Sequence, residues 1–435
     1  MNFSRFARKT GKLVNTTGQW LTVIVLSTPV LGCNILDKGL EAVAPDKVET
    51  SSLEVPANAN LIVNSAVGNF ECALNSYIVG AGMMSGELMD ATPTASNWPF
   101  DRRDIDFSSD TKYATNECTD RGIYTPMQVA RGTSERALEL LQGWTDAQVA
   151  NRQALIAKAA AYAGYARLIL AEGFCEMAFN LGPKLSTAEA LAAAEEMFNT
   201  AITAATAAGD NQMLNMARVG RARTRLDLGN KAGATADAAL VPAGFVQYAT
   251  AEADPFRRQN RVVALNSGNQ VSVAPSYRNL TVTNASGTAV PDTRVAVVPK
   301  GENGSDNKTP MYLQTKYATT SSPIPIASYK EAQLIVAEVA QGQTAVGIIN
   351  NLRAARGLPA FSSTNAGAIA AEVTEARRRE LFLEGQHLYD VRRLTLPLDP
   401  APGLQYETST PKGGVYGTER CFPLPEVEVL NNPNI

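Results

Sequence analysis

The stretch EVTEARRRELFLEGQHLYDVRRL, residues 372–394, combines charged and large apolar side chains in one continuous helical pattern. Its apolar residues are spread around the helix, so several of its faces are expected to be covered by protein. Charges of both signs lie among them, and a buried charge persists only when it is paired and hydrogen-bonded. The sequence therefore predicts one uninterrupted helix, held to its neighbours by a structural charge network that includes Arg378, Glu380, Glu384 and Asp390.

Within this stretch, residues 377–393 resemble the RRxELaFEGxRxxDLrR signature of the SusD/RagB-like outer-membrane nutrient-binding lipoproteins. The departures are mild: Leu383 stands in a small-residue position, His387 in a basic one and Val391 in a leucine one. Two later matches follow the order of the family. Residues 350–359 are close to its LNxxRxRxGLP motif, and residues 421–434 resemble its closing PIP…E…NPN.

This resemblance implies a mainly α fold, in which a SusD-like, tetratricopeptide-type helical scaffold carries an irregular capping region of loops and short strands. The expected organisation is a lipoprotein signal peptide (1–32), a lipidated tether (33–60) and one SusD-like domain (61–435). Within this domain, the helical scaffold is expected mainly at 125–245 and 326–395, and the irregular capping regions at 87–121 and 242–325.

The N-terminus has the features of an export signal. Basic residues precede an apolar run, 20–31, that is too short to span a bilayer but suits a signal peptide. The run ends in Val30-Leu31-Gly32-Cys33, which resembles a bacterial lipobox, so Cys33 is the expected lipid attachment site. The alternative is an ordinary export signal with an incidental cysteine. No later stretch is expected to cross the membrane, so the mature protein should be anchored to a membrane by its lipid. The family resemblance implies that this is the outer membrane and that the protein faces the cell exterior.

The four remaining cysteines could form two disulfides in an oxidising compartment, with three possible connectivities. Cys72 and Cys118 flank the first long loop and are the expected pair, and Cys175 and Cys421 are the other candidates. Their wide spacing does not indicate a metal site, and we expect no cofactor. The aspartates 101, 104, 106 and 110 miss the spacing of an EF-hand calcium loop.

Helical signals dominate the middle of the chain. The first helix is expected over residues 61–77, and capping-box patterns at Thr145, Ser186 and Ser328 each predict a helix start. Alanine-rich segments at 187–208 and 215–240, with Gly209 and Gly229 as C-caps, favour tetratricopeptide-like hairpins. Small residues such as Gly164 predict close approach of a neighbouring backbone. Ordinary antiparallel helix packing is the alternative interpretation.

Binding is better supported by the sequence than catalysis. No P-loop, dinucleotide motif or HExxH pair is present, and a net charge of −3 argues against a nucleic-acid surface. Aromatic residues in the two irregular regions are candidates to stack on sugar or hold peptide: Trp98, Phe100, Tyr113, Tyr277 and Tyr312. Trp98 is the first choice, and its alternative role is to pack under its own loop.

Three functions follow. The resemblance implies a non-catalytic lipoprotein that captures a glycan or peptide and delivers it to a TonB-dependent, SusC-like barrel. The second hypothesis is a tetratricopeptide-like envelope interaction protein without a nutrient ligand, and the third is an exported glycosidase.

Overall fold

The fold was analysed in a computed structural model that describes residues 50–435, except 116–117, 119–120, 254–257, 285 and 407–411. The signal peptide, Cys33 and most of the tether therefore lie outside the described residues. The chain divides into the units Met1–Ser52 and Leu53–Ile435, and the second unit is the one described below.

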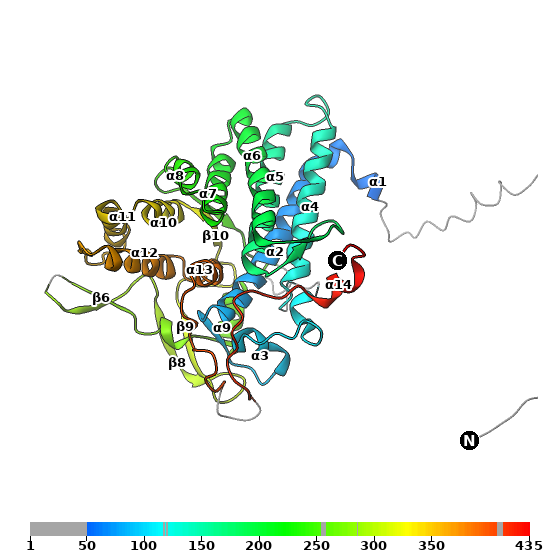
Figure 1. Cartoon of the computed structure of the whole chain (residues 1–435). Coiled ribbons are helices and arrows are strands. Elements are labelled where there is room, and N and C mark those ends of the chain that lie inside the picture. The colour runs from blue at the N-terminus through cyan, green and yellow to red at the C-terminus, as the bar shows by residue number, and fades with distance from the viewer. Residues whose placement is uncertain (1–49, 116–117, 119–120, 254–257, 285, 407–411) are drawn as a thin grey trace, which may run out of the picture. The chain divides into compact units, whose positions relative to one another are not determined.

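The scaffold begins with α2 (Ala59–Met84), which is longer than the predicted 61–77 because its second half is buried on every side. Neighbouring helices then stand side by side in chain order (Figure 1), as their mutual packing also shows. They are α4 (Tyr124–Gly143), α5 (Arg152–Gly173), α6 (Thr187–Ala208), α7 (Asn211–Asp227) and α8 (Lys231–Ala238). After the second capping region the scaffold resumes with α10 (Tyr329–Ala340), α11 (Gly342–Ala354), α12 (Ala366–Glu380) and α13 (His387–Arg393), and the chain ends near α14 (Glu426–Asn431).

Local capping decides several of these boundaries. Ser186 and Glu189 form a reciprocal capping box, and Gly209, at φ 68°, ends α6, so this helix runs as predicted. The box predicted at Thr145 is wrong as a helix start. Its backbone N–H does bond to the Gln148 side chain, but this closes only a turn, and α5 begins seven residues later.

Helix α5 is the centre of the core. Among the described residues it is the one helix that is long and apolar enough to cross a membrane, judged by length and composition alone. This differs from the expectation that no such stretch follows the signal peptide. Most of this helix is buried within the protein, as the core helix of a folded domain would be. Gly164 faces a ring and not a backbone: a Cβ there would lie 2.7 Å from Cε1 of Phe198, and Gly220 approaches the same ring. The small residues therefore make room for one large aromatic side chain.

The prediction of one uninterrupted helix over residues 372–394 is wrong. Residues 381–386 form a turn between α12 and α13, with Leu383 at φ 56° and Gly385 at φ 81°. The Leu383 N–H donates to Oε1 of Glu87 at 2.9 Å, and a Cβ on Gly385 would lie 3.1 Å from Ile78 of α2. The turn is thus stabilised by packing on α2 and by a buried carboxylate, neither of which is encoded locally.

The capping regions contain short antiparallel strand pairs, as predicted, and one further pair, at residues 177–178 and 184–185, lies in the first scaffold segment. The pairs are β1 (Leu88–Asp90) with β5 (Val271–Val273), β2 (Met177–Ala178) with β3 (Lys184–Leu185), β4 (Val246–Ala249) with β10 (Ile324–Ser328), β6 (Thr281–Thr283) with β7 (Ala289–Pro291), and β8 (Val297–Asn303) with β9 (Pro310–Gln314). Short helices α3 (Trp98–Arg102) and α9 (Arg261–Ser267) lie among them. The β1–β5 pair joins the two capping regions to each other, so they form one structure although about 180 residues apart in sequence.

Candidate functional site

Trp98 does not present its ring to solvent. The side chain is 8% exposed, packs with Tyr406 and Tyr416, and donates its Nε1–H to the carbonyl of Thr92 at 3.0 Å. An indole that is covered and hydrogen-bonded on its polar edge has no free face on which a sugar could stack. The prediction of Trp98 as the leading ligand residue is therefore corrected: it packs under its own loop.

Phe100, Tyr113 and Tyr277 are buried as well. Phe100 and Tyr113 both pack on Phe422 from the C-terminal tail, with ring centroids 5.9 and 6.5 Å apart. Tyr277 stacks on Phe382 at 4.9 Å. The irregular regions have no continuous helix or large sheet to supply a core, so these rings supply it.

Tyr312 alone among the five predicted aromatic residues is partly exposed, and the guanidinium of Arg278 lies 3.9 Å above its ring. The five residues therefore do not converge on one binding surface. Nor do the aspartates of the first capping region form a cation site: Asp101 is buried and accepts from the Asp90 N–H and the Tyr406 hydroxyl. Burial raises the pKa of Asp101 to about 7, and no group of three or more metal-ligating side chains occurs among the described residues.

The two disulfides join distant elements. Cys72 of α2 pairs with Cys118, with Cα atoms 5.6 Å apart, and Cys175 pairs with Cys421 at 5.2 Å. The first is the pair expected from the sequence, and it closes the first capping region onto α2.

The predicted charge network is present around the break between α12 and α13. Arg378 pairs with Glu375 at 2.7 Å, and Asp390 accepts from both Arg377 and Arg393. Burial alone would raise the pKa of Asp390, but the two guanidinium groups outweigh it and hold the pKa well below its ordinary value. The Arg377–Asp390 pair connects α12 to α13, whereas the other two pairs lie within one helix each.

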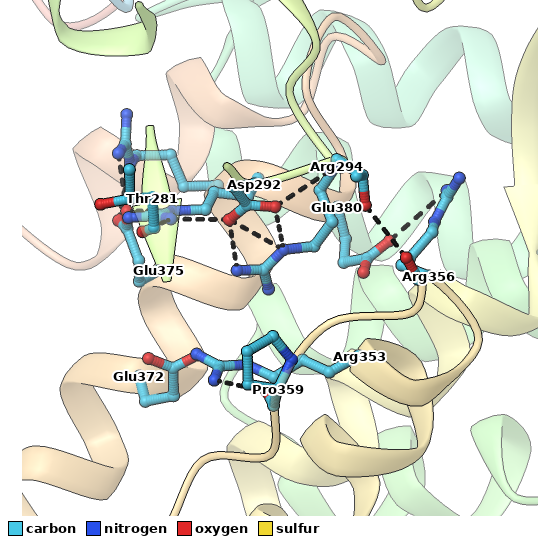
Figure 2. A network of polar contacts seen from close by, with 12 residues as sticks. Thr281, Asp292, Arg294, Arg353, Arg356, Pro359, Glu372, Glu375 and Glu380 are labelled. Carbon is cyan, nitrogen blue, oxygen red and sulfur yellow. Dashed lines mark hydrogen bonds and ion pairs between the residues drawn. The ribbon is translucent and has the colours of Figure 1, made fainter. Parts of the chain in front are cut away.

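A second part of the network fastens the capping region to α12. Figure 2 shows Asp292 between arginine side chains, with Glu375 on one side and Glu380 on the other. Arg379 bonds to Asp292 at 2.6 Å and to the carbonyl of Thr281 at 2.9 Å, so it holds both strands of the hairpin that contains β6. This hairpin extends past α12 (Figure 1), and the arginine anchors its base.

The best candidate for a binding site is a cavity of about 810 Å³ between the β4–β10 pair, the turn at residues 316–318, helices α10 and α11, and the break after α12. This volume falls within the range typical of small-molecule sites. Most of its wall is apolar, and its aromatic and polar lining includes Phe245, Tyr248, Tyr317, Tyr329, Gln333, Asn351, Lys316, Lys330, Arg356, Glu380 and Glu384.

Glu384 organises the charges of this cavity. It accepts from Nζ of Lys316 at 2.6 Å and from Nζ of Lys330 at 2.9 Å. Burial alone would raise its pKa, but the two ammonium groups outweigh burial and hold the pKa below its ordinary value. Burial also lowers the pKa of Lys316 to about 8, against the opposing effect of Glu384. The carboxylate therefore holds both lysines at the edge of the cavity.

Arg356 and Glu380 line the same cavity, and Lys330 donates to the Glu380 carbonyl. Arg356 follows α11, and its Nη2 lies 3.7 Å from Oε2 of Glu380. The Glu380 side chain is only 1% exposed, and burial raises its pKa. Glu384 is covered to a similar degree, so both carboxylates lie at the bottom of the cavity with almost no accessible surface.

No protein-family model matches this sequence, and no curated protein matches it. Solved structures do match. They include a SusD-like carbohydrate binding protein from Bacteroides fragilis, with a TM-score of 0.61 and 16% identity over 87% of this chain and 98% of that chain. The chain has a SusD-like fold. A second SusD-like carbohydrate binding protein, from Bacteroides vulgatus, matches with a TM-score of 0.60 and 14% identity over 88% of this chain and 97% of that one. A SusD superfamily protein from Bacteroides vulgatus matches with a TM-score of 0.62 and 14% identity over 88% of this chain and 98% of that chain. The sequence-based prediction of a SusD-like helical scaffold is confirmed.

Sequence reasoning assigned Glu380 and Glu384 to the scaffold of this SusD-like fold but missed the cavity that they underlie. Tyr248 is the aromatic residue most open to that cavity, at 43% exposure. It sits in a four-residue strand with no distinctive local pattern, so no signal in the sequence separates it from the buried tyrosines.

Proposed function

We propose that this protein is a non-catalytic, cell-surface nutrient-binding lipoprotein that captures a glycan or peptide and delivers it to a TonB-dependent, SusC-like outer-membrane barrel. The observation that carries this proposal is the SusD-like fold over nearly the whole described chain, shared with proteins described as carbohydrate binding. The signature resemblance and the lipobox at Cys33 support it independently.

The cavity beside α10 and α11 is the proposed capture site. It offers an accessible tyrosine face, side-chain amides and cationic groups over an apolar wall. Few polar groups on an apolar surface are what a site needs to orient a ligand without reacting with it. The covered carboxylates favour binding over glycoside hydrolysis, which needs two carboxyl groups that flank the scissile bond.

The anchor is tested by Cys33→Ala. A single acyl-bearing residue supplies the membrane affinity that a folded soluble domain lacks, so the variant should move from the membrane fraction to the soluble fraction. A variant that remains in the membrane fraction would contradict the lipid-anchor part of the proposal.

The transport role is tested by copurification from detergent-solubilised membranes, with uptake measured in a strain that lacks only this protein. The expected result is recovery with a large barrel protein and loss of uptake of one nutrient. The purified protein should bind a member of a combined glycan and peptide library. Recovery alone, normal uptake of every nutrient and no library ligand would overturn the proposal in favour of an envelope interaction protein.

A further inference from the structure

The charged side chains of the cavity are sorted by depth. Five charged residues line it. The carboxylates lie underneath, because the side chain of Glu380 is 1% exposed and that of Glu384 is 2% exposed. The cations keep accessible surface: 18% for Lys316, 18% for Lys330 and 46% for Arg356. A ligand that enters the cavity therefore meets positive charge first.

The cations also retain hydrogen-bonding capacity. An ammonium group has three N–H donors. Lys316 uses two, on Glu384 and on the Phe382 carbonyl, and Lys330 uses two, on Glu384 and on the Glu380 carbonyl. Arg356 makes only the 3.7 Å ion pair among the side-chain contacts found in the described part of the chain, so its guanidinium fork is available for an oxygen ligand.

Neutral recognition groups surround these cations. Tyr248 lines the cavity and is 43% exposed, and the half-buried Tyr329 lines it as well. The side-chain amides of Gln333 and Asn351 make no hydrogen bond to the described residues, and both line the cavity. A flat aromatic face with nearby amide donors and acceptors matches a pyranose ring, which has an apolar face and a hydroxyl-bearing rim.

We propose that this cavity takes an acidic oligosaccharide, with a sugar carboxylate held by Arg356 and Lys330 and the ring of the same or the next sugar against Tyr248. A saccharide is favoured over an acidic peptide because amides and a tyrosine face accompany the cations. The inference rests on the proposed function and adds the chemical class of the ligand.

The test is titration calorimetry on the purified full domain with trisaccharides of galacturonic, glucuronic and mannuronic acid. Each is paired with its carboxyl-reduced, neutral counterpart, so the two members differ only in the carboxylate. At least one acidic member should bind about tenfold or more tightly than its neutral partner at low salt, and the difference should shrink as ionic strength rises.

Two variants locate the site. Arg356→Gln should weaken the acidic ligand about tenfold or more and leave the neutral one unchanged. Tyr248→Ala should weaken both by about 2- to 12-fold. Both side chains are substantially exposed, so the variants should fold. The matched controls are Arg136→Gln, at 47% side-chain exposure on α4, and Phe107→Ala, at 48% exposure, and neither should change binding.

The outcomes separate the two proposals. Neutral trisaccharides that bind as tightly as acidic ones, or an equal loss of binding in Arg136→Gln, would overturn the acidic assignment while the capture function stands. An acidic peptide that binds through Arg356, with no saccharide bound, would overturn the saccharide class. Failure of every saccharide and every peptide to bind would instead overturn the proposed function itself.

Discussion

Replacing Glu384 with glutamine should destabilise the protein strongly. The carboxylate is 2% exposed and accepts charge-assisted hydrogen bonds from Lys316 and Lys330 at 2.6 and 2.9 Å. Glutamine has nearly the same shape but no charge, so two largely covered ammonium groups lose their counter-ion. Breaking a buried pair by removing one partner costs about 3 to 5 kcal/mol, and the shared carboxylate places this change toward the upper part of that range.

The assay is urea denaturation followed by circular dichroism, with the free energy of unfolding compared between wild type and variant. Glu302→Gln is the matched control, because Glu302 pairs with Lys300 at 2.7 Å but is 52% exposed. An exposed pair contributes about 0 to 1 kcal/mol. Lys316→Met in the Glu384→Gln background should recover part of the loss, since it removes one of the stranded charges.

The pH dependence gives the sign of the effect. The pKa of Glu384 is lower in the folded protein than in the unfolded chain, so the unfolded chain binds more protons as the pH falls. The stabilisation from Glu384 is therefore present above the ordinary glutamate pKa and is lost below it. The difference between wild type and Glu384→Gln should shrink in acid. Equal stability of the two proteins at pH 7 would refute the reasoning.

Other predictions concern buried groups elsewhere. His387 is the only histidine, and burial lowers its pKa to about 4. The NMR signals of its imidazole should therefore not titrate between pH 7 and pH 5. An apparent pKa at or above 6.5 would contradict its burial. Between pH 6.5 and 4 the unfolded imidazole binds a proton that the folded one does not, so this group lowers stability as the pH falls. Replacing both Cys72 and Cys118 with alanine should lower the free energy of unfolding by about 4 kcal/mol, because the disulfide closes a loop with a sequence separation of 46 in the unfolded chain. Mass spectrometry of the unreduced wild type should recover the linked peptides and not free thiols. Trp98→Ala should lower the free energy of unfolding, measured by urea denaturation, by about 3 to 5 kcal/mol because the side chain is buried. The control Phe107→Ala should change stability little because Phe107 is exposed. Unaltered stability of Trp98→Ala together with lost ligand binding would instead place Trp98 in the binding site.

The location of the candidate site could not be predicted from the sequence. Aromatic residues in long irregular segments were the natural candidates, yet Trp98, Phe100 and Tyr113 are buried because their segments must build a core of their own. The cavity instead forms where a strand pair, two helices and a turn meet. Tyr248 lines it from strand β4, where it pairs with Pro325 of β10, a strand that lies far along the chain.

The sequence by itself determined features whose causes are local or chemical. The limits of α6 follow from the Ser186 box and from Gly209, and each of these acts within one helical turn. The pairing of opposite charges after residue 376 follows from the cost of burying any one of them alone. The tertiary structure alone decided where the signature helix breaks, because the N–H of Leu383 finds Glu87, 296 residues away, and Gly385 packs on α2. It also decided which tyrosine stays exposed, since burial depends on what surrounds a residue and not on its immediate neighbours in the chain.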